Sequence, residues 1–195
     1  PEFAAELAAA GRQKPIWAIV RPACFSAAYW IASQAERILV TPSCELGSIG
    51  VMAVHVDVSA SDAQQGYKLT FFNAGDRKLD GNPHLPINEA FARDVQAGVE
   101  RAYGEFVAAV ARGRGQRFGE KAIRATEART YEADAAVKLG MADQVATFNE
   151  TIRAFAERLA KGSTPMPAAS VASQTSTTQR NKESAMTDPV KPGTE

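Results

Sequence analysis

The chain of 195 residues has few cysteines and histidines, no excess of either charge and no long apolar run. Two cysteines and two histidines are too few for a disulfide framework or a histidine-rich metal site. Acidic and basic residues balance at 22 each, so charge gives no reason to expect nucleic acid or an anionic membrane as a partner. No apolar run approaches the ~20 residues needed to cross a bilayer. We therefore expect no metal, no cofactor, no nucleic-acid partner and no membrane segment in this chain.

The remaining composition is typical of a soluble globular protein, with 45% hydrophobic and 23% charged residues. The length is sufficient for one domain with a buried core. Cys24 and Cys44 lie in apolar or mixed surroundings, so we expect two reduced, buried thiols. The chain begins at Pro1 rather than Met and shows no signal peptide, which suggests a piece of a longer protein.

Strand-like and helix-like segments alternate along most of the chain. Runs of β-branched and aromatic residues predict strands, and apolar residues at spacings of three and four predict helices, the longest of them capped by Asn88. This alternation predicts an α/β fold with a largely parallel sheet. The expected strands are 16–20, 37–41, 51–58 and 68–72. The expected helices are 3–10, 26–34, 59–65, 88–112, 120–128, 132–139 and 148–161.

The composition changes at Gly162, after which Ser, Thr, Pro, Ala and Gln dominate without apolar periodicity. Such a segment cannot bury enough surface to offset its chain entropy. We therefore expect one folded domain over 1–162 and a disordered Ser/Thr/Pro-rich segment over 163–195.

One serine stands at a predicted strand-to-helix turn. Ser26 follows the strand 16–20 after a short break and precedes Ala27, Ala28 and a helical run. A hydroxyl at a helix N-terminus lies beside unpaired backbone N–H groups and the positive end of the helix dipole, which stabilise an oxyanion. Ser26 is therefore a candidate nucleophile, although serine also caps helices without any chemistry.

A nucleophilic serine needs a base, which histidine or lysine could supply. His55 lies inside a predicted strand and His84 in a proline-flanked loop, which favours structural or surface roles and argues against a Ser-His-Asp triad. A neutral lysine amine can also take the proton of a serine. Lys78 lies beside Arg77 in a glycine-bounded loop and is the better candidate base, the alternative being an ordinary solvated lysine.

Four motifs in this order resemble the S49 peptidase family, the signal peptide peptidase A family: SAAYWIAS, GSIGV, AGDRKLDGNP and YEADAAVKLGMAD. The chain most resembles the tailed-phage branch of that family, the head maturation (minor capsid) proteases. The resemblance covers roughly residues 4–160. It implies the ClpP/crotonase-like fold, an α/β spiral of ββα units, and a Ser–Lys catalytic dyad.

The resemblance also assigns roles to particular residues. Ser26 resembles the nucleophile, and Lys78 resembles the general base. Ser48 resembles the family serine that hydrogen-bonds the lysine amine and orients it. The backbone N–H of Ala27 corresponds to one oxyanion donor, and Tyr29 corresponds to a packing position with a structural role.

The chain departs from the family pattern in two ways. Ser26 is followed by two alanines, where the cellular enzymes typically have two glycines. The family takes a second oxyanion donor from a Gly-Gly segment on an earlier strand-to-helix turn, and we expect that turn and the first strands to precede residue 1. Losing one such donor costs about 10²–10³ in rate. We therefore expect this chain by itself to be weakly active or inactive.

The resemblance implies a serine endopeptidase that processes scaffold and capsid proteins during phage head assembly. Two alternatives remain open: a cellular signal peptide peptidase, and a catalytically inactive, capsid-associated structural homologue. A crotonase-type acyl-CoA enzyme shares the fold but lacks the serine–lysine pair. Family members assemble into rings, so we expect a polypeptide substrate and a homo-oligomeric ring to which the helix 88–112 contributes. The expected location is the host or bacterial cytoplasm, in the prohead or virion for a phage member.

The C-terminal segment has a further point of resemblance. Phage members often join a polar linker to scaffolding sequence, and residues 163–185 resemble such a linker. The sequence Ser184-Ala185-Met186-Thr187 resembles the internal start of a scaffold segment. The alternative is a tail without such a role.

Overall fold

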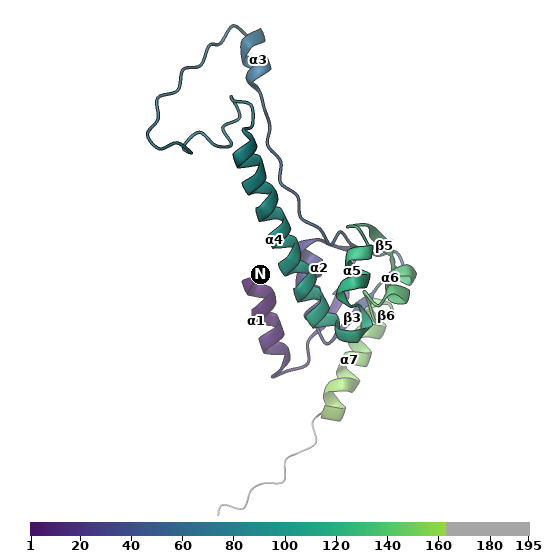
Figure 1. The fold of residues 1–195 in the computed structure, drawn as a ribbon. Helices are drawn as coiled ribbons and strands as arrows, with labels where there is room; N and C mark the ends of the chain where they lie inside the picture. The colour runs from purple at the N-terminus through teal and green to yellow at the C-terminus, as the bar shows by residue number, and fades with distance from the viewer. Residues whose placement is uncertain (163–195) are drawn as a thin grey trace, which may run out of the picture. The chain divides into compact units, whose positions relative to one another are not determined.

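The computed structural model describes residues 1–162, in which short strands and helices follow one another in a repeated order (Figure 1). Two strands are followed by a helix, and then two further strands begin the next unit. The predicted linker and scaffold-like segment over 163–195 lie outside the described residues. The elements of the first two units are β1 (Trp17–Val20), β2 (Ala23–Phe25), α2 (Ala27–Ala32), β3 (Arg37–Val40) and β4 (Glu45–Gly47).

The two units stack so that equivalent strands pair in parallel. β3 pairs with β1, and β4 pairs with β2, which starts two separate sheets. β6 (Gln144–Val145) extends the first sheet in parallel, and β5 (Thr130–Glu132) extends the second in antiparallel fashion. This stacking of ββα units confirms the predicted α/β class and the predicted ClpP/crotonase-like spiral.

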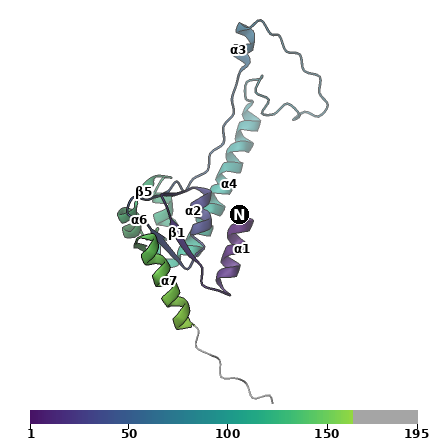
Figure 2. The ribbon, with the colours of Figure 1, turned by 180° about the vertical axis from the view of Figure 1, so that it is seen from behind.

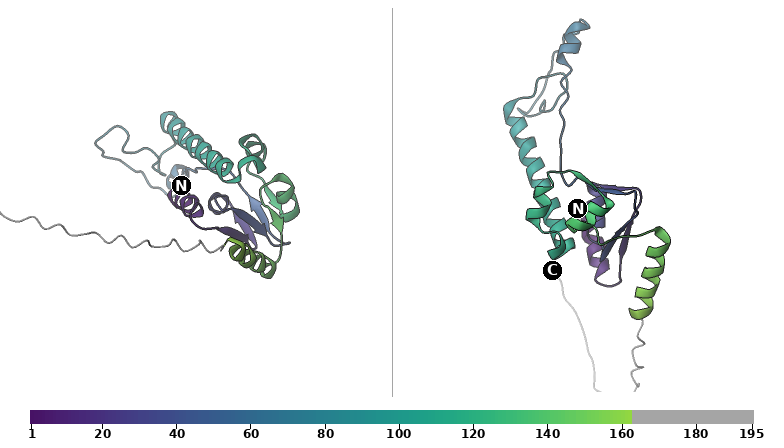
Figure 3. Two further views of the ribbon diagram at one scale, coloured as in Figure 1. Left: turned by 90° about the horizontal axis from the view of Figure 1, so that it is seen from below. Right: turned by 90° about the vertical axis from the view of Figure 1, so that its right-hand side faces the viewer.

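Helices cover both sides of these sheets. Figure 3 shows the long helix α4 on one side and α7 on the other, with the strands between them. The helix α1 lies beside α2 and α4 (Figures 1 and 2). Beyond α2, the helices are α1 (Glu2–Gly11), α3 (Ser59–Gln64), α4 (Glu89–Arg114), the 3₁₀ turn Gly115–Arg117, α5 (Glu120–Ala125), α6 (Ala133–Leu139) and α7 (Phe148–Gly162).

Local sequence signals account for the ends of several helices. The side chain of Asn88 accepts a hydrogen bond of 2.8 Å from the N–H of Phe91, so it caps α4 as predicted. Gly140 ends α6 in the left-handed conformation, with φ of 82°. A Cβ at this position would lie 1.8 Å from the carbonyl oxygen of Arg117, so only glycine fits.

The core gathers around the central strand of the first sheet and the side chains of α2 and α4. Ile38, Leu39 and Val40 of β3 are fully buried between β1 and β6. Tyr29 is 0% exposed, and its hydroxyl donates a hydrogen bond of 2.9 Å to the carbonyl oxygen of Met141. Tyr29 therefore has the structural role that the sequence predicts.

A buried ion pair joins the end of α4 to the first sheet. Arg114 is 0% exposed and donates to the Asp143 carboxylate at 3.0 Å and to the carbonyl oxygen of Gly140 at 2.9 Å. The same carboxylate accepts the backbone N–H of Ile38 at 2.6 Å. Burial alone raises the pKa of Asp143, but these hydrogen bonds outweigh burial, so its pKa lies below the usual value.

The strands predicted over 51–58 and 68–72 are wrong. Both segments belong to an arm, residues 51–88, that runs away from the sheets and returns at the start of α4 (Figure 1). Their β-branched and aromatic residues favour a pleated surface, but the described residues provide no neighbouring strand to pair with them. The predicted helix over 59–65 is confirmed as α3, and the helix expected over 120–128 ends at Ala125.

The hydroxyl of Tyr29 provides a test of the core. We expect Tyr29→Phe to lower the free energy of unfolding by about 1–3 kcal/mol, because it leaves the buried carbonyl of Met141 without its partner. Urea denaturation measures this change. Tyr67→Phe is the matched control, since Tyr67 is exposed on the arm and its substitution should change stability by less than about 0.5 kcal/mol. Equal stability of the two variants would show that the Tyr29 hydrogen bond contributes nothing.

Candidate active site

Ser26 lies at the turn between β2 and α2, where the sequence predicts a nucleophile. Its backbone has a φ of 50°, a conformation that L-residues rarely adopt. The turn is held by the Ser26 N–H, which donates to the carbonyl oxygen of Gly47 at 2.9 Å, and by the Trp30 N–H, which donates to the carbonyl oxygen of Ser26 at 3.0 Å. The Ser26 side chain makes no capping hydrogen bond to α2. The hydroxyl is therefore not used as a helix cap.

The first N–H of α2 is available for an oxyanion. In the part of the chain that the structure describes, the backbone N–H of Ala27 donates no hydrogen bond, as is usual for the first residue of a helix. Ala27 is also exposed. An oxygen held beside Ser26 would therefore meet an unpaired donor at the positive end of the helix.

Ser48 occupies an equivalent turn at the end of β4. Its φ is 54°, and that of Gly47 before it is 133°. The Ser48 N–H donates to the carbonyl oxygen of Arg129 at 3.1 Å. A Cβ on Gly47 would lie 2.4 Å from the same oxygen, so glycine is required immediately before Ser48.

Arg129 belongs to a turn that the sequence analysis missed. Glu127 and Ala128 both have positive φ, at 48° and 59°. Ala128 also limits the space beside Gly50, because a Cβ on Gly50 would lie 2.7 Å from that of Ala128. The turn contains no glycine, so the sequence carries no local signal for it.

Ser26 and Ser48 line one pocket of about 500 Å³. Trp30 and Phe106 form part of its wall, with stacked rings whose centroids are 4.6 Å apart. The remaining lining residues are Ala27, Gly50, Val51, Met52 and Ala128. The two serines thus share a predominantly apolar pocket that could hold an apolar side chain of a polypeptide.

Lys78 does not lie in this pocket. It is exposed in the arm, and Figures 1 and 2 show that part of the arm at the far end of α4 from the sheets. Its neighbour Arg77 forms ion pairs with Asp80 and Asp94. Asp94 and Phe106 are twelve residues apart on α4, or ~18 Å at 1.5 Å per residue. A single chain in this conformation therefore brings Ser26 and Ser48 together but leaves Lys78 apart.

The cysteines and histidines offer no competing chemistry at the pocket. Cys24 and Cys44 are free and buried, and burial raises the pKa of each thiol to about 11. Both are therefore protonated at neutral pH, where a thiol is a poor nucleophile. His84 contacts Asp62 at 2.7 Å within the arm, and neither His84 nor His55 lines the pocket of Ser26.

A model of peptidase family S49 matches residues 8–162. This chain belongs to peptidase family S49. The match confirms the resemblance carried by the four sequence motifs.

The helices within residues 1–162 include none with both the length and the apolar character that a membrane span requires. No group of three or more His, Cys, Asp or Glu residues in that range is placed to hold a metal ion.

Two similar proteins come from phages. The chain is 33% identical over 148 residues to the head-tail preconnector protein GP5 of Enterobacteria phage P21, covering 76% of this chain and 29% of that protein. It is 30% identical over 146 residues to capsid assembly protease C of Escherichia phage lambda, covering 75% of this chain and 33% of that protein. The chain thus spans about a third of the length of these relatives. This similarity agrees with the predicted head maturation branch of the family.

Among solved structures, the chain is similar to the 1510-N membrane-bound stomatin-specific protease. The similarity has a TM-score of 0.44 at 14% identity and covers 77% of this chain and 60% of that one. An enoyl-CoA hydratase from Shewanella pealeana is similar with a TM-score of 0.42 at 14% identity, over 80% of this chain and 43% of that one.

The glycine before Ser48 provides a test of how the candidate site is held in place. We expect Gly47→Ala to lower the free energy of unfolding by more than about 1 kcal/mol, because the new Cβ meets the Arg129 oxygen at a strained φ. Gly104→Ala is the matched control within α4, where nothing lies within 4 Å of the new Cβ. That change should leave stability equal or raise it by up to about 1 kcal/mol. Equal losses in the two variants would contradict the close approach of Gly47 to Arg129.

Proposed function

We propose that this chain forms the catalytic domain of a serine endopeptidase that uses a Ser–Lys dyad and processes capsid or scaffold polypeptides in phage head assembly. The observation that carries the proposal is the shared pocket of Ser26 and Ser48, in which the Ser26 hydroxyl is uncapped and the Ala27 N–H is unpaired. Membership of peptidase family S49 and similarity to a capsid assembly protease support it.

In the proposed reaction, the Ser26 Oγ attacks the scissile carbonyl carbon while a neutral Lys78 amine takes the hydroxyl proton. The Ala27 N–H donates to the oxyanion of the tetrahedral intermediate. Ser48 forms a hydrogen bond with the Lys78 amine and thereby orients it. The lysine then gives its proton to the leaving amine as the peptide bond breaks. Water next attacks the carbonyl carbon of the acyl-enzyme while Lys78 takes a proton from the water, and the lysine returns that proton to the Ser26 Oγ as the ester bond breaks.

Within one chain, Lys78 lies too far from the pocket to act as the base of Ser26. Arg77, the neighbour of Lys78, pairs with Asp94, which lies ~18 Å along α4 from Phe106 in the pocket. We therefore propose that a second copy of the chain supplies the lysine. The arm that carries it exposes apolar side chains that a single chain leaves uncovered, among them Phe72 at 94% and Met52 at 81%. Assembly of copies would cover these side chains, which agrees with the predicted homo-oligomeric ring.

A capsid-associated structural homologue without activity is the second candidate. The separation of Lys78 from Ser26 within one chain is the observation that favours it. It is distinguished from the peptidase by the reactivity of Ser26 in the assembled protein.

Labelling of the full-length protein with a fluorophosphonate tests the dyad. We expect Ser26→Ala and Lys78→Ala to lose labelling, because the first removes the nucleophile and the second removes the base. Lys68→Ala is the matched control, since Lys68 is also exposed on the arm and should keep full labelling. Labelling that survives Ser26→Ala would contradict the nucleophile assignment. The same loss in Lys68→Ala would show that the arm matters for folding rather than for its base.

Mixing two inactive variants tests where the lysine comes from. We expect Ser26→Ala and Lys78→Ala, dissociated and reassembled together, to regain part of the labelling, because copies with an intact Ser26 then meet copies with an intact Lys78. Each variant reassembled alone is the control and should remain unlabelled. Absence of recovery in mixtures that do form mixed oligomers would place both residues of the dyad in one chain.

A further inference from the structure

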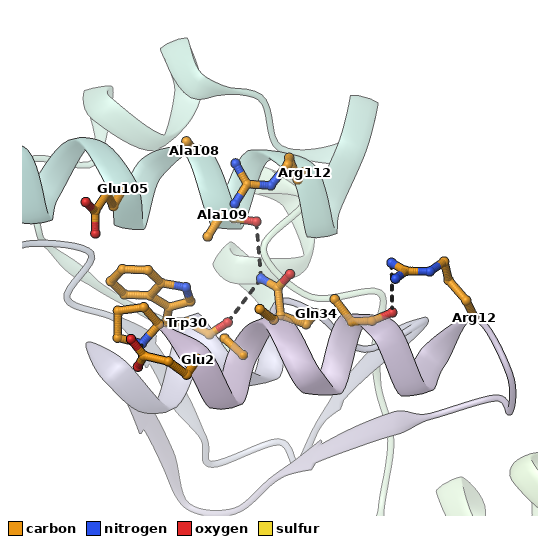
Figure 4. Close-up of a pocket in the computed structure, with 12 residues that line it drawn as sticks. Glu2, Arg12, Trp30, Gln34, Glu105, Ala108, Ala109 and Arg112 are labelled. Atoms are coloured by element: carbon orange, nitrogen blue, oxygen red, sulfur yellow. Dashed lines mark hydrogen bonds and ion pairs between the residues drawn. The ribbon is translucent and has the colours of Figure 1, made fainter. Parts of the chain in front are cut away.

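A second groove adjoins the pocket of Ser26 and has no role in the mechanism above. It has a volume of about 640 Å³ and lies between α1 and α4. Figure 4 shows the two helices as its walls, with the side chains of Trp30, from α2, and Gln34, from the turn after α2, between them. The Gln34 amide donates to the carbonyl oxygens of Trp30 at 3.2 Å and Ala109 at 3.1 Å, which fixes the floor to α4.

Small side chains keep this groove open. The α1 wall presents Ala4, Ala5 and Ala8, and the α4 wall presents Ala108 and Ala109. Alanine allows backbone to approach closely and leaves the space between the helices unfilled. The groove volume of about 640 Å³ lies within the range typical of ligand-binding pockets.

The groove adjoins the candidate active site, and the two cavities have the side chain of Trp30 in common. Trp30 lines both the groove and the pocket of Ser26, and its ring is stacked on Phe106, which lines the pocket. A polypeptide with one residue in the pocket can therefore continue over the edge of Trp30 into the groove.

The far end of the groove is basic. Arg12 follows the last residue of α1, and Arg112 lies in the last turn of α4 (Figure 4). Both are exposed, and neither forms an ion pair with a carboxylate in residues 1–162. Glu105, which likewise has no ion pair there, lies at the end nearer to Trp30. The groove thus changes from acidic to basic with distance from Ser26.

We propose that this groove is a subsite for the substrate polypeptide and that Arg12 and Arg112 select an acidic side chain at a distance from the scissile bond. The proposal rests on the peptidase function proposed above. The occupant is the substrate itself, because the groove adjoins the pocket of Ser26 at Trp30 and the guanidinium groups of Arg12 and Arg112, which form no ion pair within residues 1–162, are complementary to a carboxylate. Glu105 disfavours an acidic residue at the near end.

Helix geometry gives the distance to the selected residue. Ser26 and Trp30 are one turn apart at the start of α2, or ~6 Å. Phe106 and Arg112 are six residues apart on α4, or ~9 Å. A path that follows α2 and then α4 in this way is ~15 Å long, which corresponds to about four or five residues of extended polypeptide at ~3.3 Å each. The acidic residue should therefore lie about four or five positions from the scissile bond.

Binding of labelled peptides to the Ser26→Ala variant tests this subsite without cleavage. The probes are fluorescein-labelled peptides with one apolar residue at the expected pocket position. Each peptide carries Asp-Asp or Lys-Lys at the fourth and fifth positions from the apolar residue, on either its N-terminal or its C-terminal side. At low salt we expect tighter binding of the Asp-Asp peptide on one of the two sides. In the Arg12→Glu, Arg112→Glu double variant, its affinity should fall about tenfold and the preference should reverse, since attraction is replaced by repulsion.

Two controls make the result specific. Reversing Arg153 and Lys161, which are exposed on α7, gives the same change of net charge away from the groove and should leave the preference intact. The neutral Arg12→Gln, Arg112→Gln variant should lose the preference without reversing it. Raising the salt concentration should weaken the preference, because exposed charges are screened.

The outcomes separate the subsite from the peptidase function. No measurable binding, equal binding of the Asp-Asp and Lys-Lys peptides, or an unchanged preference in the Arg12→Glu, Arg112→Glu variant would overturn the subsite. If the protein with Ser26 intact is still labelled by fluorophosphonate in that case, the peptidase function stands without it. A charge preference without any labelling would instead support the groove and contradict the peptidase function.

Discussion

The parallel pairing of β2 with β4 is the constraint on which the candidate site depends. It aligns Phe25 with Gly47, so the next residues, Ser26 and Ser48, leave the second sheet at the same edge. Both serines have positive φ and therefore turn sharply out of their strands. Because the strands are adjacent, the two serines line one pocket. Strain in the two turns is held by hydrogen bonds to Gly47 and Arg129.

The helices α2 and α4 hold this edge of the second sheet in place. The first sheet is joined to α4 by the buried pair of Arg114 and Asp143, and α2 is anchored through Tyr29. α4 in turn carries Phe106 to the pocket, where its ring stacks on Trp30. The same helix extends beyond the sheets and holds the arm at its N-terminal end. One helix thus contacts both the candidate nucleophile's pocket and the loop with the candidate base, but at opposite ends.

The arm has large apolar side chains that a single chain leaves exposed. Val54, Val56 and Phe72 are exposed, and the segment 51–57 forms no strand. Exposed apolar surface of this extent typically marks an interaction site. The sequence predicted strands here because β-branched and aromatic residues favour burial against a neighbouring surface. Residue types do not indicate whether that surface belongs to the same chain or to another one.

The sequence was informative wherever the signal was local. Asn88 and the apolar spacing of 88–112 predicted the start and the extent of a long helix, which the structure confirms as α4. The short strands β2 and β4 were missed, because three residues carry too little pattern to be recognised. The turn at Glu127 and Ala128 was also missed, since it lacks glycine and is held by tertiary contacts.

The α/β class could be predicted from the sequence alone, because it depends on local periodicity. The family and the residue types of a possible Ser–Lys dyad could also be predicted, because they depend on motifs contiguous along the chain. Only the tertiary structure decided that Ser26 and Ser48 share a pocket and that Lys78 lies apart from it. It also showed that a groove with charges unpaired within residues 1–162 adjoins that pocket at Trp30. Such relations depend on strand pairing, helix direction and contacts between residues distant in sequence, and spacing along the chain does not specify them.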